Sequence, residues 1–398
     1  MKILMLTPYL PYPLLSGGQI RSYNLLKNLA KKHEITLVAL IKHDTEKKYI
    51  KNIAEFCHKV IVSKRPEKPW TLTNIIRTGF GKYPFLVVRN FSPEAKKAVI
   101  EELEQETFDL IHAETFYVMP HIPPTKAPVL LVEQTIEYLV YQHFVETITF
   151  PPLQWLFSID VNKIRFWEEH FWKQAQRVIA MSEPDKKVMQ RNVAHLEVSI
   201  VPNGVDSDFF TFRKKTIHEN PRILFVGNFK WLQNREAASE LVTRIWPIIN
   251  KRLPQAKLWI VGRFPTQDIL SLKSKQVEIS DTVDDIREAY RSSDVLLAPI
   301  YGPGGTRFKI LEAMASGLPV VTTSQGIEGL GVTDGKEALV RNDPEQLAQA
   351  TINLLTNKNL YQQLARRADE LVRKTYNWVA IAKSLDSIYE AVGHVKNN

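Results

Sequence analysis

The chain has 398 residues, 44% of them hydrophobic and 24% charged, which is enough for two folded domains of about 200 residues each. Its one cysteine, Cys57, excludes an internal disulfide framework and a thiolate metal cluster, as expected in a reducing compartment. The net charge of +9 suits anionic partners, but the basic residues are dispersed and carry no RNA-binding or helix-turn-helix signature, so we expect no nucleic-acid partner.

The N-terminal residues predict a strand–loop–helix–strand unit. Lys2–Thr7 (KILMLT) indicates a short buried strand, too short for the core of a signal peptide, and no run in the chain approaches the ~20 apolar residues of a membrane span. We therefore predict a cytoplasmic protein. A loop ending at Gly17 and Gly18 precedes a helical pattern and a second strand, Ile35–Ile41. The GxGxxG spacing is missing, which disfavours a dinucleotide and favours backbone contact with a phosphate or sugar.

More strands alternate with helical segments along the first half of the chain. Leu110–Ala113 (LIHA) places His112 and Glu114 at the carboxyl end of a strand, where the active groups of open parallel sheets gather. A lone histidine at a strand end is more often structural, so both a structural and a functional interpretation of His112 stay open.

The segment from Tyr138 to Trp172 is unusually aromatic. Pro151 and Pro152 in its middle prevent it from forming one continuous helix. Core packing accounts for most of its rings. In the alternative interpretation, four residues form a surface that touches a membrane or a lipid acceptor, namely Phe150, Trp155, Leu156 and Phe157.

A strand end followed by a proline–asparagine–glycine turn, Ile200–Phe210, predicts a joint between two domains. We expect a first domain over residues 1–203 and a second over 204–377, with a C-terminal helix (378–398) that packs back on the first. In the second domain the pattern predicts a strand at Arg222–Gly227 and a helix at Glu236–Leu253.

The stretch Leu296–Val321 (LLAPIYGPGGTRFKILEAMASGLPVV) is the most informative part of the sequence. An apolar strand ends in a glycine-rich loop, Thr306 occupies the position of a helix N-cap, and helical spacing follows. Such a turn presents free N–H groups and the positive end of a helix dipole, which suit a phosphate, and Arg307 and Lys309 add two cations. No Gly-Lys-[Ser/Thr] closes the loop, so it is no Walker P-loop, and similar turns occur without a ligand.

Five segments, taken in order, resemble the GT-B glycosyltransferases of the large retaining family 4. They are SGGQIRSYNLLKNLAKKHEITLVAL, FDLIHAE, VPNGVDSDFF, ILFVGN and GGTRFKILEAMASGLPVVTT. The resemblance runs nearly end to end. It implies an α/β fold in which two Rossmann-like domains face each other across a cleft.

The resemblance also implies roles for individual residues. Glu312 matches the second glutamate of the family's Glu-x7-Glu motif, which binds the ribose hydroxyls of the nucleotide. Gly17 and Gly18 match the loop that touches the donor phosphates and shapes the acceptor side. His112 matches the histidine that faces the donor sugar, and Val283 lies where backbone groups hold the base.

The sequence departs from the family pattern at two places. Gly304 stands where the first glutamate of the motif is expected, and Asn228 follows Gly227 where the family has arginine, although Lys230 partly substitutes. We therefore assign the charge that binds the diphosphate chiefly to Arg307 and Lys309, since one guanidinium and one ammonium can stabilise a leaving diphosphate without metal.

These features predict transfer of a sugar from a nucleotide-diphosphate sugar to an acceptor hydroxyl, without metal or cofactor and, by resemblance, with retention of configuration. The candidate catalytic residues are His112, Arg307 and Lys309. The candidate substrate-binding residues are Gly17, Gly18, Glu114, Asn228, Lys230, Val283, Gly304, Gly305, Thr306 and Glu312.

The expected acceptor is a glycan or a lipid-linked molecule in polysaccharide, glycan or glycolipid assembly, with peripheral association at the inner membrane face. Two alternatives stay open. One is a sugar-nucleotide 2-epimerase. The other is a catalytically degenerate GT-B partner subunit, which the glycine at position 304 motivates.

Overall fold

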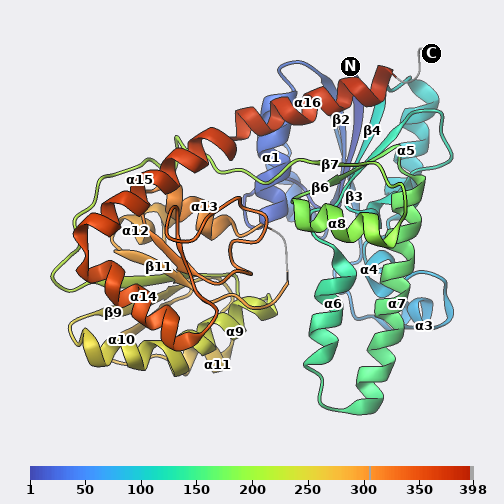
Figure 1. The fold of residues 1–398 in the computed structure, drawn as a ribbon. Helices are drawn as coiled ribbons and strands as arrows, with labels where there is room; N and C mark the ends of the chain where they lie inside the picture. Colours follow the sequence, from blue (N-terminus) through green and yellow to red (C-terminus); the bar gives the residue numbers. More distant parts are fainter. Residues whose placement is uncertain (304–305, 395–398) are drawn as a thin grey trace. The chain divides into compact units, whose positions relative to one another are not determined.

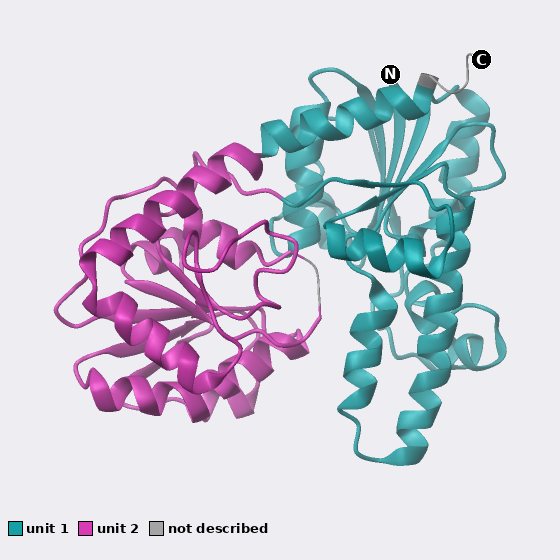
Figure 2. Cartoon of the chain, in the orientation of Figure 1, with its two compact units in different colours: residues 1–203, 378–398 teal, residues 204–377 magenta. Residues whose placement is uncertain are grey.

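A computed structural model describes residues 1–303 and 306–394 of the chain, which divide into two compact α/β units (Figures 1 and 2). Unit 1 contains residues 1–203 and the C-terminal segment that begins at Trp378. Unit 2 contains residues 204–377. Each unit has its own parallel sheet and its own hydrophobic core.

Unit 1 is built on a parallel sheet with the strand order β3-β2-β1-β4-β5-β6-β7. The strands are β1 (Lys2–Thr7), β2 (Glu34–Ile41), β3 (Lys59–Lys64), β4 (Leu110–Glu114), β5 (Val129–Val132), β6 (Arg177–Ala180) and β7 (Val198–Ile200). Their near-continuous Val, Ile and Leu runs are buried, as expected when helices cover both faces of a parallel sheet. The chain reverses its winding between β1 and β4, so a crevice is expected at the carboxyl ends of these two strands.

Several helices of unit 1 begin at residues whose side chains satisfy their first N–H groups. Ser16 caps α1, Thr71 caps α3, Ser92 caps α5 and Ser182 caps α8, each through its side-chain oxygen. The helices are α1 (Gly17–Leu29), α2 (Lys51–Ala54), α3 (Leu72–Phe80), α4 (Phe85–Val88), α5 (Pro93–Gln105), α6 (Glu137–Glu146), α7 (Pro151–Gln174), α8 (Glu183–Asn192) and α16 (Trp378–His394).

The aromatic segment folds as a pair of helices, because its proline pair starts a new helix. Pro151 occupies the first position of α7, where its missing N–H costs nothing. The predicted break in this segment is therefore confirmed. Helices α6 and α7 lie side by side as a hairpin that extends from the sheet of unit 1 (Figure 1).

Helix α16 belongs to unit 1 although it lies far from the rest of that unit in sequence. It packs along α1 and buries Leu385 and Tyr389. Its Asp386 accepts hydrogen bonds from Lys32 (2.7 Å) and His33 (2.8 Å), which follow α1. Apolar burial and this ion pair together hold α16 on unit 1.

Unit 2 has a second parallel sheet with the order β10-β9-β8-β11-β12-β13. Its strands are β8 (Arg222–Val226), β9 (Lys257–Val261), β10 (Val277–Ser280), β11 (Val295–Ala298), β12 (Val320–Thr322) and β13 (Leu339–Val340). Its helices are α9 (Leu232–Glu240), α10 (Trp246–Arg252), α11 (Gln267–Leu270), α12 (Ile286–Arg291), α13 (Phe308–Ala315), α14 (Pro344–Thr356) and α15 (Lys358–Thr375). The winding reverses between β8 and β11.

The helix predicted at Glu236–Leu253 is not one regular helix. A π-helical turn, Leu241–Ile245, separates α9 from α10. Pro247 lies at the start of α10 and cannot donate a backbone hydrogen bond, so the regular i to i−4 pattern is interrupted before it.

None of the helices in residues 1–303 and 306–394 combines the length and the apolar character needed to cross a bilayer.

Two loops at the carboxyl edge of the unit 2 sheet approach so closely that one of them requires glycine. A Cβ on Gly262, after β9, would lie 1.7 Å from the carbonyl oxygen of Gly227, after β8. Because both atoms belong to backbone, neither can move aside cheaply. This close contact holds the loop after β8 against the loop after β9.

We expect Gly262→Ala to destabilise unit 2 by about 2–3 kcal/mol, because the methyl group must displace backbone. Urea unfolding of the full chain measures this destabilisation, with hydrogen exchange of peptides covering β8 and β9 as the readout. Gly79→Ala is the matched control, since a Cβ there meets nothing within 4 Å and a helical alanine should stabilise slightly. Equal midpoints for Gly262→Ala and the wild type would contradict the close approach.

Candidate functional site

The carboxyl edge of the unit 2 sheet brings together the loop after β8, the loop after β11 and the start of α13. The first loop contains Asn228 and Lys230, and the second begins at Pro299 and includes Gly302. Since β8 and β11 are neighbours at the winding reversal, these loops lie at the sheet edge where open α/β sheets bind ligands.

Helix α13 begins one residue later than the sequence predicts. Its N-cap residue is Arg307, no side chain caps it, and the predicted cap Thr306 precedes it. The carbonyl of Thr306 accepts the N–H of Phe308 (3.1 Å) in a tight local turn, which delays the start of the helix. The Arg307 guanidinium is buried and donates to the carbonyl of Gly302 (2.8 Å), so it also supports the loop that leads into the helix.

Lys309 and Glu312 lie three residues apart and therefore share one face of α13. The Lys309 ammonium donates to Oδ1 of Asn234 (2.6 Å), and Nδ2 of Asn234 donates to the carbonyl of Asn228 (2.9 Å). Tyr290 of α12 donates its hydroxyl to Glu312 (2.6 Å). Lys309 is thus connected through one asparagine to the loop after β8, and Glu312 is oriented by a tyrosine.

The charge state of this face depends on burial. Burial, helped by the nearby charge of Arg307 and opposed by Glu312, lowers the pKa of Lys309 to about 7. Burial also raises the pKa of Glu312, although the hydrogen bond from Tyr290 and the charge of Lys309 act against that rise. An anion placed beside Lys309 would favour its protonated form. Binding of an anionic ligand should therefore be coupled to protonation of Lys309.

The remaining predicted residues of unit 2 lie around this edge. Lys230 is exposed, with its ammonium 3.6 Å above the ring of Phe264. Val283, in the loop between β10 and α12, is half-buried against the core of unit 2. Gly304 and Gly305 lie outside the described residues.

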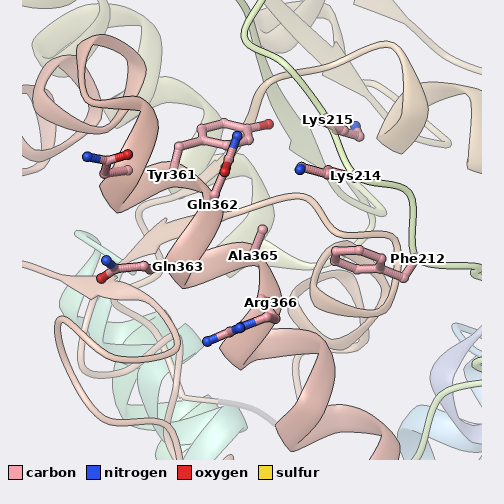
Figure 3. A pocket seen from close by; sticks show the side chains of 9 residues that line it. Phe212, Lys214, Lys215, Tyr361, Gln362, Gln363, Ala365 and Arg366 are labelled. Carbon is pink, nitrogen blue, oxygen red and sulfur yellow. The ribbon is translucent and has the colours of Figure 1, made fainter.

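Unit 2 also contains a cavity of about 430 Å³, lined in part by Phe212, Lys214, Tyr361 and Arg366 (Figure 3). A Cβ at Gly317, which follows α13, would lie 2.9 Å from the ring of Phe212. The cavity therefore borders the end of α13 opposite to its N-terminus, and none of the residues that line it belongs to the loops after β8 and β11.

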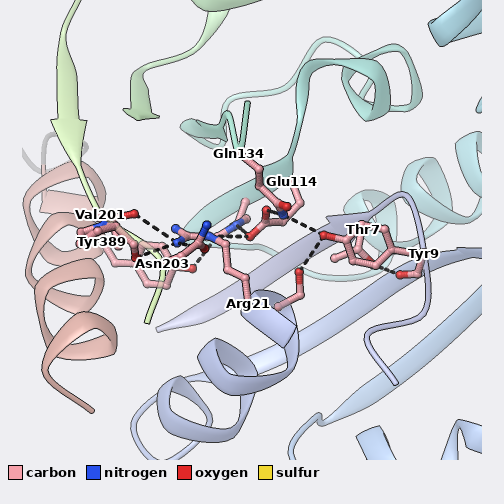
Figure 4. Close-up of polar contacts among 11 residues, drawn as sticks. Thr7, Tyr9, Arg21, Glu114, Gln134, Val201, Asn203 and Tyr389 are labelled. Carbon is pink, nitrogen blue, oxygen red and sulfur yellow. Dashed lines mark hydrogen bonds and ion pairs between the residues drawn. The ribbon is translucent and has the colours of Figure 1, made fainter. Parts of the chain in front are cut away.

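In unit 1 the corresponding sheet edge holds a fully buried ion pair. Arg21 of α1 lies with Nε 3.8 Å from Oε1 of Glu114, at the end of β4 (Figure 4). One amino group of Arg21 also donates to the carbonyl of Val201 (3.1 Å) and to Oδ1 of Asn203 (3.1 Å), in the last residues of the 1–203 segment. Burial alone would raise the pKa of Glu114, but His112 and Arg21 outweigh it and leave that pKa lowered, so the carboxylate stays ionised.

His112 lies inside this network and has no exposed surface. Its Nε2 is 3.2 Å from Oε1 of Glu114, and its Nδ1 is hydrogen-bonded to the hydroxyl of Tyr389 on α16. Both ring nitrogens are therefore occupied within unit 1. In this arrangement His112 orients Glu114, and contact with a ligand requires one of the two bonds to be given up.

Gly17 and Gly18 form the first turn of α1, directly after the capping Ser16. A Cβ on Gly18 would lie 2.4 Å from the hydroxyl of Tyr9 and 2.8 Å from Oε1 of Gln134. The amide of Gln134 in turn donates to that hydroxyl and to Glu114. The missing side chain at Gly18 therefore lets α1 begin against the polar network that surrounds Glu114.

Sequence reasoning missed the residues that orient the predicted ones, chiefly Arg21, Asn234, Tyr290 and Tyr389. Arg21 carried a usable signal, since it lies at helical spacing from the buried Leu25 and Leu29, on the face of α1 that packs on the core. The other three belong to segments with no sequence feature that links them to the residues they contact.

Two family profiles match this chain. One, described as Glycosyltransferase Family 4, matches residues 15–209, and the other, described as Glycosyl transferases group 1, matches residues 220–357. Among curated proteins, the phosphatidyl-myo-inositol mannosyltransferase of Mycobacterium leprae is 27% identical over 76% of this chain and 78% of its own length. An uncharacterized protein of the cps region of Klebsiella pneumoniae is 26% identical over 44% of this chain and 47% of its own length.

Solved structures share the fold over almost the whole chain. The sucrose-phosphate synthase of Thermosynechococcus elongatus has a TM-score of 0.73 at 19% identity, with 99% of this chain and 100% of that one covered. HepE of Anabaena, in complex with UDP and glucose, has a TM-score of 0.66 at 16% identity, with 98% and 100% covered. At these identities the likeness concerns the fold alone.

We expect Arg21→Met to destabilise unit 1 by about 3 kcal/mol, because it leaves Glu114 buried without its cation. Hydrogen exchange of peptides from β1 and β4 in rising urea measures this loss. Adding Glu114→Gln should recover part of the stability, since the unpaired charge is removed. The exposed Arg77→Met serves as the matched control, and a loss no larger than that of Arg77→Met would contradict the assignment.

Proposed function

This chain belongs to the group 1 glycosyltransferases of family 4 and has their GT-B fold of two Rossmann-like units, and from this premise we propose that it transfers a sugar from a nucleoside-diphosphate sugar to an acceptor hydroxyl. The observation that carries the proposal is the common face of α13, where Lys309 and Glu312 lie beside the buried Arg307. Two cations and one carboxylate at the start of one helix match a diphosphate linked to a ribose.

In this proposal Arg307 and Lys309 bind the diphosphate and stabilise its negative charge as the bond to the sugar breaks. Glu312, which accepts a bond from Tyr290, keeps a second oxygen for the vicinal hydroxyls of ribose. Lys230 and Asn228, in the loop tied to Lys309 through Asn234, complete the nucleotide site, and backbone groups near Val283 hold the base.

The proposed transfer retains configuration and needs no metal. Two cationic side chains can supply the charge that a divalent ion supplies elsewhere, and the N-terminus of α13 adds to it. Retention rests on family membership. The donor phosphate would accept the proton of the attacking hydroxyl, since His112 and Glu114 are engaged with each other and are buried.

For unit 1 we propose a role in shaping the acceptor side. Gly17 and Gly18 let the start of α1 lie directly against Tyr9 and Gln134, and Glu114 holds Gln134, whose amide also donates to the hydroxyl of Tyr9. His112 is then a positioning residue that acts through Glu114.

We propose that the acceptor is a glycan or a lipid-linked molecule, used in the assembly of polysaccharide or glycolipid at the inner membrane face. The names of two relatives support this class: one is a phosphatidyl-myo-inositol mannosyltransferase, and the other is encoded in a cps region. UDP and glucose bound to HepE support a nucleotide-sugar donor.

A thermal-shift panel of UDP, GDP, ADP, dTDP and CDP, each with and without Mg²⁺, tests the donor site. We expect one base to stabilise the wild type independently of Mg²⁺, with affinity about 10- to 100-fold weaker in Arg307→Ala and Glu312→Ala, since each loses a charge-assisted bond. Arg244→Ala, an exposed arginine of the same unit, is the matched control. No stabilisation by any nucleotide would overturn the donor site and favour the degenerate partner subunit.

The pH dependence of nucleotide binding tests the role of Lys309. Its pKa of about 7 in the free site should rise on binding, so one proton is taken up. Affinity should be highest below pH 7, where Lys309 is protonated before binding, and fall from pH 7 toward pH 9 by up to about tenfold per unit. Isothermal titration in buffers of different ionisation enthalpy detects the proton, and the nucleotide, whose terminal phosphate titrates near pH ~6, contributes little in that range.

Lys309→Arg provides the control for this titration, since arginine stays charged throughout. It should flatten the pH dependence between pH 7 and 9 while binding persists. A wild-type affinity that is constant over this range would exclude Lys309 as the titrating cation.

A further inference from the structure

The cavity in unit 2 that borders the C-terminal end of α13 has the size and the lining of a ligand site. Its volume of about 430 Å³ lies within the range of pockets that bind small molecules. One wall is formed by residues 212–215, and the other by residues 359–366 in the first half of α15 (Figure 3). Both walls belong to unit 2, so one folded unit contains the whole cavity.

The wall formed by residues 212–215 is held in place without a ligand. The Lys215 ammonium donates to the carbonyls of Tyr290 and Arg291 (3.1 Å) at the end of α12 and to that of Ser293 (2.8 Å), and so satisfies the last carbonyls of that helix. The ring of Phe212 occupies the space that a side chain at Gly317 would need. Because this wall is already fixed, a ligand would lose little affinity to ordering it.

Helix α15 contributes a polar stripe to the other wall. Asn359, Gln362, Gln363 and Arg366 stand at positions i, i+3, i+4 and i+7, so they share one face of the helix, and all four line the cavity. The opposite side of α15 is buried in the core of unit 2 and packs on α13, which fixes the direction of the stripe. Three of the four are carboxamides, which both donate and accept hydrogen bonds, as the hydroxyl groups of a carbohydrate require.

The acidic residues beside this stripe leave its arginine available to a ligand. Among the described residues that line the cavity, none is acidic. On the next turn of α15, Oε1 of Glu370 lies 3.6 Å from Nε of Arg366, and both side chains are exposed, so this pair contributes little. The neighbouring Asp369 is bound by Arg373 (2.9 Å). Arg366 therefore keeps N–H groups that can bind an anion.

The wall formed by residues 212–215 supplies a second cation. Lys215 is not that cation, because three carbonyls hold its ammonium and burial lowers its pKa to about 8 against the nearby charge of Asp294. Asp294 is itself fully buried and accepts the backbone N–H groups of His218 (3.0 Å) and Arg222 (2.8 Å). Lys214 lines the cavity and is exposed, so an anion in the cavity can reach its ammonium.

We propose that this cavity binds a small anionic carbohydrate, namely a monosaccharide that carries a phosphate or a carboxylate. Lys214 and Arg366 bind the anionic group from different walls. The carboxamides of the α15 stripe exchange hydrogen bonds with the hydroxyl groups, and the ring of Phe212 offers an apolar surface to the C–H face of the sugar. The proposed donor site lies at the N-terminal end of α13, so the carbohydrate and the nucleotide bind independently. The inference goes beyond the proposed transfer reaction.

Isothermal titration of the full chain with glucose 6-phosphate, glucuronate, glucose and inorganic phosphate tests this site. We expect at least one of the two anionic sugars to bind, with glucose and phosphate each about tenfold weaker or more, and added salt to weaken the binding. Lys214→Gln and Arg366→Gln should each weaken it about three- to tenfold. Lys374→Gln, at an exposed lysine of α15 outside the cavity lining, is the matched control and should change nothing.

Hydrogen exchange locates the bound sugar, with protection expected in peptides that cover residues 212–215 and 359–366. Gln362→Trp, at an exposed position of the stripe, should fill the cavity and abolish binding while the thermal midpoint stays unchanged. A saturating nucleotide, or Arg307→Ala, should leave the binding of the anionic sugar intact.

Three results would overturn the proposal: no binding of either anionic sugar, phosphate alone binding as tightly as they do, or displacement of the sugar by nucleotide. Nucleotide binding is measured in a separate titration, so failure of the cavity site would leave the proposed donor site standing.

Discussion

The buried ion pair between Arg21 and Glu114 is the constraint on which unit 1 depends. Removing two charges from water is costly, and the cost is offset only if both partners are held in place. Arg21 is held by Val201 and Asn203, and Glu114 is held by His112 and Gln134. Through His112 the pair reaches Tyr389 of α16, so one network joins the first helix, the central strand and the last helix of the chain.

The charged residues of the proposed donor site in unit 2 are less buried than this ion pair. Lys309 and Glu312 are only partly covered, and each has one neutral partner, Asn234 or Tyr290. A cation with a pKa near 7 and no carboxylate bonded to it is stable without a ligand, yet it gains most from an anion. In unit 1 the buried Arg21 and Glu114 neutralise each other, whereas in unit 2 the proposed ligand would neutralise Lys309.

The two units have different parts in the proposed function. Unit 2 carries the proposed donor site, and unit 1 carries the proposed acceptor side. The sequence pointed to Phe150, Trp155, Leu156 and Phe157 through the density of aromatic residues. The first three are exposed, whereas Phe157 is half-buried, with its ring near those of Trp70 and Phe144. The sequence did not point to α3, whose large apolar residues are also exposed, because a short apolar helix looks the same in sequence whether it is buried or exposed.

The sequence by itself determined the succession of strands and helices, the glycine turns at the sheet edges and the family, because these depend on local spacing and turn chemistry. Tertiary structure alone decided which charges are paired. His112 and Glu114 lie on the same strand. Arg21 precedes Glu114 by 93 residues in the sequence, and Tyr389 follows it by 275 residues. Desolvation depends on such distant partners, so the pKa of Lys309 and the ionised state of Glu114 follow from packing and cannot be read from the chain.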